Sequence, residues 1–231
     1  DGLPDIISKN LGSFNKIIMC EGEPKEAKKL RDYGYLVIDK FLSHIEGDAK
    51  FYYNKGHVGS SSLKPSGSLF LHLFTNKHYQ VYTDVIEKDV VTSTLDIELK
   101  KLGINSIDFI KIDVQGSELS IIEGFTSVSP LFWEVEVLQL PTYQETPYGV
   151  SITKELTSRG YLCFRQNGRF CRDGIFLFSN ELYMPDYTTD FGRTLILENI
   201  ERWRVMIELF DVKALGNHIE AIINPTQDTS A

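Results

Sequence analysis

The sequence has few cysteines, and their spacing matches no metal site. Among its 231 residues there are three, Cys20, Cys163 and Cys171, all in apolar, strand-like segments. We expect reduced, packed thiols, because an odd count in such settings is typical of a cytoplasmic chain. A disulfide between Cys163 and Cys171 across a hairpin is the less favoured alternative.

Long apolar runs and an excess of positive charge are also lacking. The net charge is −8, whereas binding to a nucleic-acid backbone requires a basic face. No apolar run reaches the roughly 18 residues of a membrane span, and no secretory signal pattern is visible. The first residue is Asp1 rather than methionine, so any targeting segment would lie upstream. We expect a cytoplasmic protein with neither nucleic acid nor a membrane span.

The sequence does contain an alternation of short apolar runs and amphipathic stretches. This alternation is typical of a parallel sheet with crossover helices. We expect strands at 15–20, 35–42, 107–114 and 131–140. We expect helices at 24–33, 94–102, 117–125 and 151–159, the first opened by Pro24 and closed by Gly34. The pattern predicts an α/β fold with a doubly wound, mostly parallel sheet.

Two regions depart from this alternation. Strand-like segments at 49–54 and 79–91 flank the Gly/Ser-rich stretch 56–68, which predicts a hairpin-like insertion. Near the end, 161–166 and 174–178 predict a terminal hairpin, 198–215 an amphipathic helix, and 217–223 a second helix. We therefore expect a main domain at 1–180 and a helical extension at 181–231. The extension either packs on that domain or forms a homodimer contact.

Candidate functional residues stand at three strand ends, because ligands of doubly wound sheets bind outside the carboxyl ends of the strands. The first is Glu21, which either binds a ribose diol or is a plain charge near a helix N-terminus. Glu23 suits the second role better. At the second strand end, Lys111 and Asp113 point to the same side of their strand. They form either a structural ion pair or part of a site, and Lys111 needs a carboxylate partner in either case.

The third place is the next strand along the chain, where Glu134 and Glu136 share one face. Carboxylates are rarely buried without a partner. Glu136, nearer the strand end, is a candidate for substrate contact, with an ion pair to Lys111 or an arginine as the alternative. Among the histidines, His57 in the Gly/Ser stretch is the candidate base. Ser61 lacks the strand–turn–helix setting of a hydrolase nucleophile.

Several segments resemble the FkbM-type S-adenosylmethionine-dependent methyltransferases. The run TLDIELKKLGINSIDFIKIDVQGSELSIIEGF, at 94–125, resembles the family's Thr-Leu-Asp helix and its Lys-Ile-Asp-x-x-Gly-x-Glu motif. IIMCEGEPKEAKKL, SSSL, VEVLQLPTY and DGIFLF resemble other segments of the family, with Gly22 in place of a proline. The resemblance covers about residues 1–180 and implies a Rossmann-like fold of the class I methyltransferase type. Most of the first-strand glycine loop is lacking here, with Asp1 and Gly2 as its tail.

The resemblance also implies how the cofactor S-adenosylmethionine is bound. Glu21 takes the position of the acid that holds the ribose. Asp1 and Gly2 lie near the carboxylate end of the methionine part, and a residue near Ser43 borders the adenine. Asp113 lies beside the methyl-bearing sulfonium.

The implied reaction is O-methylation of a hydroxyl on a sugar, a glycan or a secondary metabolite. An alcohol is a poor nucleophile and benefits from a general base. Asp113, Glu136 and His57 are the candidates, with Asp113 and Glu136 ranked first. Lys111 holds the carboxylates in register.

Three alternatives stay open. The first is a degenerate methyltransferase-like interaction module without catalysis, and the second is a nicotinamide-dependent oxidoreductase. A metal-dependent methyltransferase would use Asp113, Glu118 and Glu136 as oxygen ligands for Mg²⁺, although no metal is the favoured expectation.

Overall fold

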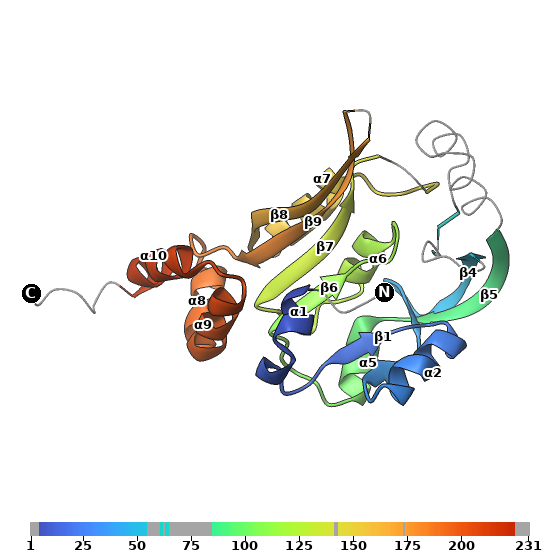
Figure 1. Ribbon diagram of the computed structural model, residues 1–231, viewed down its shortest axis with the longest axis horizontal. Coiled ribbons are helices and arrows are strands. Elements are labelled where there is room, and N and C mark those ends of the chain that lie inside the picture. The colour runs from blue at the N-terminus through green and yellow to red at the C-terminus, as the bar shows by residue number, and fades with distance from the viewer. Residues whose placement is uncertain are drawn as a thin grey trace, which may run out of the picture.

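A computed structural model describes residues 5–54, 61, 63–64, 85–140, 143–172 and 174–224. Asp1, Gly2 and His57 lie outside these residues. The described chain is a mixed α/β structure (Figure 1). Its strands hydrogen-bond into three sheets of two, three and four strands. The single doubly wound sheet is therefore not confirmed, although the α/β class is.

The first sheet pairs β1 (Ile18–Cys20) with β2 (Leu36–Ile38) in parallel, joined by α2 (Pro24–Asp32). Short α1 (Asp5–Lys9) and a 3₁₀ turn (Leu11–Ser13) precede it. Pro24 occupies the first turn of α2, where its missing N–H costs nothing. Gly34 follows the helix with a left-handed φ of 92°, which glycine adopts readily. The predicted strand–helix–strand unit is confirmed.

The second sheet has the order β3 (Phe41–Leu42), β5 (Val85–Ser93), β4 (Gly47–Asn54). Strands β4 and β5 form an antiparallel ribbon from Gly47 opposite Thr92 to Asn54 opposite Val85. This ribbon confirms the predicted insertion, whose connecting residues lie mostly outside the described chain. The single strand predicted at 35–42 is wrong. Charged Asp39 and Lys40 interrupt it, and the chain passes from β2 in one sheet to β3 in the next.

The third sheet has the order β6 (Phe109–Ile112), β7 (Phe132–Leu138), β9 (Ile175–Pro185), β8 (Tyr161–Arg172). Strands β6 and β7 are parallel, and β9 runs antiparallel to both β7 and β8. Helices α5 (Leu95–Lys101), α6 (Glu118–Glu123) and α7 (Gly149–Ser158) complete this half of the molecule. The terminal hairpin is longer than predicted, because β9 continues to Pro185.

Strand β7 lies at the centre of the molecule, and every residue in it is buried. Trp133, Val135 and Val137 belong to a core cluster shared with α5, α6 and α7. Phe132 belongs to a second cluster, together with the C-terminal helices. The two faces of one strand therefore carry two apolar cores.

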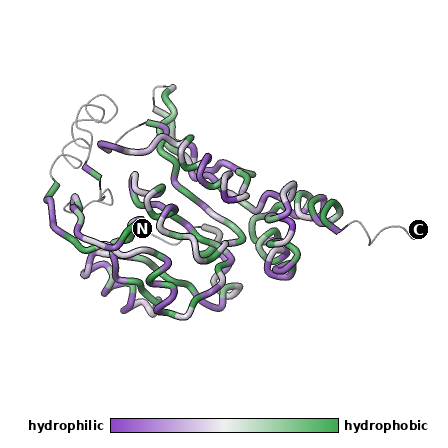
Figure 2. The backbone as a smooth tube through the Cα atoms, turned by 180° about the vertical axis from the view of Figure 1, so that it is seen from behind, coloured by the Kyte–Doolittle hydropathy of each residue, from purple (hydrophilic) through white to green (hydrophobic). Residues whose placement is uncertain are grey.

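The C-terminal helices are α8 (Asp190–Glu198), α9 (Ile200–Leu209) and α10 (Lys213–Ile223). The single helix predicted at 198–215 is wrong, because Asp211 takes a left-handed φ of 54° and separates α9 from α10. Hydrophobic and hydrophilic residues alternate along these helices (Figure 2), since one side of each faces the core. None of the described helices is both long and apolar enough to cross a bilayer.

The cysteines are free among the described residues, in agreement with the expectation of reduced thiols, but they are exposed rather than packed. Cys163 and Cys171 lie on one strand, β8, opposite Tyr183 and Phe176 of β9. They do not face each other across the hairpin, and the alternative of a disulfide fails for that reason.

Candidate functional site

The candidate site lies at the carboxyl ends of the parallel strands β6 and β7. The register pairs Ile112 of β6 with Val135 of β7. Asp113 and Glu136, which follow these two residues, are therefore neighbours. We call Lys111, Asp113, Gln115 and Glu136 the carboxylate cluster. The structure thus brings together three residues that the sequence predicts for the site, Lys111, Asp113 and Glu136, and adds Gln115.

Asp113 is held from two sides. The Lys111 Nζ lies 3.1 Å from its Oδ2, and the Gln115 Nε2 donates to its Oδ1 at 3.0 Å. The predicted carboxylate partner of Lys111 is therefore confirmed. The Asp113 side chain keeps about a third of its surface exposed, at 34%. It is fixed in place and still accessible to a ligand.

Glu136 is nearly buried, with 7% of its surface exposed. Its Oε2 accepts a hydrogen bond from the Gln115 Nε2 at 3.0 Å. Burial, followed by the negative charges of Asp113 and Glu118, raises the pKa of Glu136 to about 8, although Lys111 opposes the shift. The Glu136 carboxyl group therefore titrates much nearer to neutral pH than an ordinary glutamate does, as suits a group that exchanges a proton with a substrate.

Glu118 braces the loop between β6 and α6. The metal-dependent alternative made Glu118 a magnesium ligand, but its carboxylate accepts hydrogen bonds from the backbone N–H groups of Val114 and Gly116 at 2.9 to 3.1 Å. Burial raises the pKa of Glu118 to about 7 despite these donors. Gly116 has a left-handed φ of 107°, and a Cβ there would lie 3.1 Å from the Tyr143 ring. The glycine of the motif is therefore needed for this close packing.

Sequence reasoning missed the roles of one cluster residue, Gln115, and of two residues that contact it, Tyr143 and Ser61. Gln115 is a variable position of the resembling motif, and nothing in the sequence indicates its left-handed φ of 60°. The Tyr143 hydroxyl donates to its side-chain Oε1 at 3.1 Å, and the Ser61 hydroxyl donates to its backbone oxygen at 2.7 Å. Tyr143 was noted only as part of a resembling segment, and Ser61 was otherwise considered only as a hydrolase nucleophile, which its setting disfavours. Their contacts depend on tertiary structure.

Glu21 follows β1 directly, and its Oε1 accepts a hydrogen bond from the Glu23 N–H at 2.7 Å. Burial raises the pKa of Glu21. Glu23, the better N-terminal charge on sequence grounds, instead pairs with Lys88 of β5 at 3.1 Å. A Cβ on Gly22 would lie 2.6 Å from the Phe41 ring. This contact explains why glycine replaces the proline of the resembling family.

Ser43 follows β3 and joins this end of the second sheet to α6. Its hydroxyl lies 3.1 Å from the Ser120 hydroxyl, and its N–H donates to the Ser93 carbonyl at 2.9 Å. The backbone of Ser43 and His44 passes so close to Gly124 that a Cβ there would lie 2.4 Å from the Ser43 oxygen. The position of Ser43 is therefore fixed by packing on α6.

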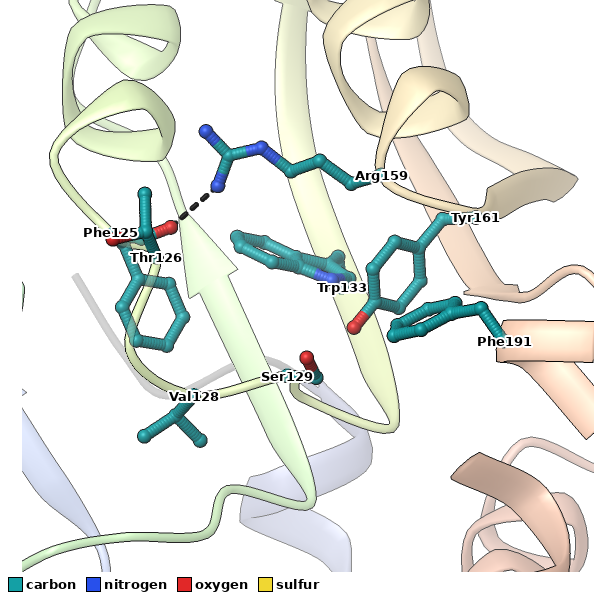
Figure 3. A pocket seen from close by; sticks show the side chains of 8 residues that line it. All are labelled: Phe125, Thr126, Val128, Ser129, Trp133, Arg159, Tyr161 and Phe191. Carbon is teal, nitrogen blue, oxygen red and sulfur yellow. Dashed lines mark hydrogen bonds between the residues drawn. The ribbon is translucent and has the colours of Figure 1, made fainter. Parts of the chain in front are cut away.

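A cavity of about 270 Å³ lies near the other end of β7, where Trp133 stands (Figure 3). The Arg159 guanidinium crosses it and donates to the Phe125 carbonyl. The cavity is separate from the carboxylate cluster. In the part of the chain that is described, no group of three His, Cys, Asp or Glu side chains is arranged to hold a metal ion, so the magnesium alternative gains no support.

Comparison with known proteins agrees with the geometry. A family model described as the methyltransferase FkbM domain matches residues 6–163, well over half of the chain. No curated protein and no solved structure matches the chain significantly. The chain belongs to the FkbM methyltransferase family.

Proposed function

We propose that this methyltransferase uses S-adenosylmethionine to methylate a hydroxyl group on a sugar, a glycan or a secondary metabolite. One observation carries the proposal of O-methylation. Accessible Asp113 lies beside buried Glu136, whose pKa is raised to about 8. A hydroxyl nucleophile must lose a proton, and a base with a pKa near the working pH accepts it most effectively.

Glu21 fits the proposed ribose site. It is partly buried at the carboxyl end of β1, and one of its two carboxylate oxygens holds the Glu23 N–H. The other oxygen accepts no hydrogen bond from the described residues and is free to accept one from a diol. Ser43 is proposed to border the adenine, and Asp1 and Gly2 to lie near the carboxylate end of the cofactor. When bound, the cofactor supplies the electrophilic methyl group.

The proposed catalysis consists of positioning and proton transfer. Asp113 orients the acceptor hydroxyl, and Lys111 holds the Asp113 carboxylate in place. Glu136 in its ionised form, which becomes populated as the pH approaches 8, accepts the proton of the hydroxyl, directly or through Asp113. His57 remains a further candidate base outside the described residues. Correct placement of two reacting groups supplies several kcal/mol of an enzyme's rate acceleration, so the ordering of this cluster matters as much as its basicity.

We further propose that the three sheets belong to one Rossmann-like, doubly wound arrangement. Within each of the pairs β1–β2 and β6–β7 the strands are parallel. Among the described strands, β1 and β6 each have a single neighbour, as expected if another strand lies between them. The C-terminal helices α8 to α10 are proposed to form part of this domain, since α9 and β7 share a core.

Titration calorimetry with S-adenosylhomocysteine tests the cofactor class. We expect micromolar binding that weakens by about tenfold or more in Glu21→Ala, because a hydrogen bond to a charged group contributes about 1.5–3 kcal/mol. Glu26→Ala is the matched control, since Glu26 forms an exposed pair with Lys29 on α2. Equal affinity in Glu21→Ala and the native chain would overturn the ribose assignment.

Absence of binding by the native chain would require the same titration on a version that includes any upstream residues. Binding by that version alone would assign the cofactor site to both parts together. Absence of binding by both would overturn the proposed function.

A further inference from the structure

Gln115 lies between the two carboxyl groups of the cluster and is bonded to both. Its Nε2 donates to the Asp113 Oδ1 at 3.0 Å and to the Glu136 Oε2 at 3.0 Å. Its Oε1 accepts a hydrogen bond from the Tyr143 hydroxyl at 3.1 Å. A primary amide has two N–H donors, so each donor serves one carboxyl group. The amide of Gln115 therefore joins Asp113 to Glu136 without adding charge.

The orientation of this amide is determined by Tyr143. A tyrosine hydroxyl that donates to Oε1 distinguishes the oxygen end of the amide from the nitrogen end. If the amide turned over, its oxygen would face two carboxyl groups, and its nitrogen would face the hydroxyl. Tyr143 is itself 2% exposed and packs against Gly116, so its hydroxyl is held in place.

The backbone of Gln115 is held in an unfavourable conformation. Its φ of 60° is uncommon for residues other than glycine, and such strain is often found at functional sites. The Ser61 hydroxyl donates to the Gln115 carbonyl at 2.7 Å and accepts from the Leu63 N–H at 3.0 Å. Ser61 is 1% exposed. The connection between β4 and β5 therefore reaches into the cluster and fastens Gln115 there.

Three separate segments, which contain Ser61, Glu136 and Tyr143, thus fix the backbone and the side chain of Gln115. Two neighbouring carboxyl groups repel each other when both are charged, and a donor shared between them reduces this cost. Hydrogen bonds to a carboxylate favour its charged form. Loss of the amide would therefore remove a donor that favours the charged form of Glu136 and make Glu136 hold its proton more tightly.

We propose that Gln115 is a positioning residue, which holds Asp113 and Glu136 in fixed relation to each other while Tyr143 and Ser61 fix its amide and its backbone. Gln115 acts through these two carboxyl groups and does not contact the reacting hydroxyl. The inference rests on the proposed function only where it treats Glu136 as the base.

The test is to measure the titration of Glu136 directly by NMR of protein labelled with carboxyl-¹³C glutamate. The signal that is missing in Glu136→Gln identifies Glu136. Gln115→Met keeps the length of the side chain and removes both donors. We expect the pKa of Glu136 to rise by about one unit in this variant. Tyr143→Phe should cause a smaller rise, because the amide remains but loses its orienting donor. Gln144→Ala, at an exposed neighbouring position, should leave the titration unchanged.

Steady-state kinetics supply the second measurement. In Gln115→Met we expect kcat to fall by about 10- to 100-fold with little change in KM, and the rising limb of the pH profile to move upward with the Glu136 titration. An unchanged Glu136 titration in both folded variants, Gln115→Met and Tyr143→Phe, would overturn the inference whatever the activity. A shifted titration with an unshifted pH profile would support the positioning role and show that Glu136 is not the base, which separates this inference from the proposed function.

Discussion

At the scale of single residues, the buried carboxyl group of Glu136 makes stability depend on pH. Its pKa is about 8 in the folded chain against an ordinary value of 4.5. The folded state therefore binds this proton more tightly than the unfolded state does. Stability falls as the pH rises from about 4.5 to about 8, because over this range the unfolded chain ionises Glu136 freely while the folded chain still holds its proton.

We accordingly expect Glu136→Gln to be more stable than the native chain at alkaline pH. The unfolding free energy of Glu136→Gln should exceed that of the native chain by on the order of 2–4 kcal/mol more at a pH of about 8.5 than at a pH of about 5. Urea denaturation at both pH values measures it. Glu123→Gln, at an exposed position of α6, is the control. Parallel stability curves for Glu136→Gln and the native chain would contradict the raised pKa.

The sequence was informative about residues whose type alone indicates their surroundings. Lys111 within an apolar strand requires a carboxylate, and Asp113 provides it. Glu136 indicates a functional site, because a carboxylate in a buried strand is rarely without a partner. Gln115 gives no such signal, because its position between two carboxyl groups results from the register of β6 with β7 and from contacts with Ser61 and Tyr143. Contacts between segments far apart in the chain are not visible in local patterns.

At the scale of elements, Asp96 joins the start of α5 to the loop between α6 and β7. Its place in the first turn of α5 suits the helix dipole, but the carboxylate also has nearer partners. It accepts hydrogen bonds from the N–H and hydroxyl groups of Thr126 and Ser127 at 2.7 to 3.1 Å. Although partial burial opposes it, these donors hold the pKa of Asp96 below its usual range. The carboxylate is therefore a structural link between two elements.

Replacement of Asp96 by alanine should destabilise the chain by about 1.5–3 kcal/mol at neutral pH, the usual loss for hydrogen bonds to a charged group. Because the folded-state pKa is lowered, this stabilisation is present above the ordinary value of 3.8 and is lost as the pH falls through the folded-state pKa. Chemical denaturation at neutral and acid pH checks both statements. Asp32→Ala, which removes an exposed pair with Lys28, should cost less than about 1 kcal/mol. An equal loss for both variants would contradict the link.

Predictions of elements succeeded where capping residues and periodicity agreed. Thr94 accepts the Ile97 N–H at the start of α5, as its position before an amphipathic stretch indicates. The segment 35–42 was misread as one strand, because its apolar residues continue on both sides of Asp39. The division into β2 and β3 follows from pairing with β1 and β5, which are far apart in the sequence. Helix α8 was missed although Thr189 caps it.

At the scale of the whole molecule, the C-terminal helices are built onto the strand that carries Glu136. Trp203 of α9 is fully buried, and its ring stacks on that of Phe132 in β7 with 5.2 Å between centroids. The apolar face of α9, on which a dimer contact would depend, is therefore largely used within the chain. Phe132 on one face of β7 and Trp133 on the other connect the helical core to the core beneath the candidate site.

This shared strand predicts that the extension and the rest of the chain unfold together. Trp133 and Trp203 are the two tryptophans of the sequence, so Trp203→Phe leaves Trp133 as a single fluorescent reporter of the core beneath the site. In that variant we expect Trp133 fluorescence and far-ultraviolet circular dichroism to give coincident urea transitions, as a two-state domain requires. Trp203→Ala should lower the unfolding free energy by about 3–5 kcal/mol, whereas Val205→Ala, 47% exposed on the same helix, should change it by less than about 0.5 kcal/mol. A helical transition that precedes the loss of Trp133 fluorescence would show instead that the extension is an independent unit. The coupling of α9 to Glu136 through β7 would then be wrong.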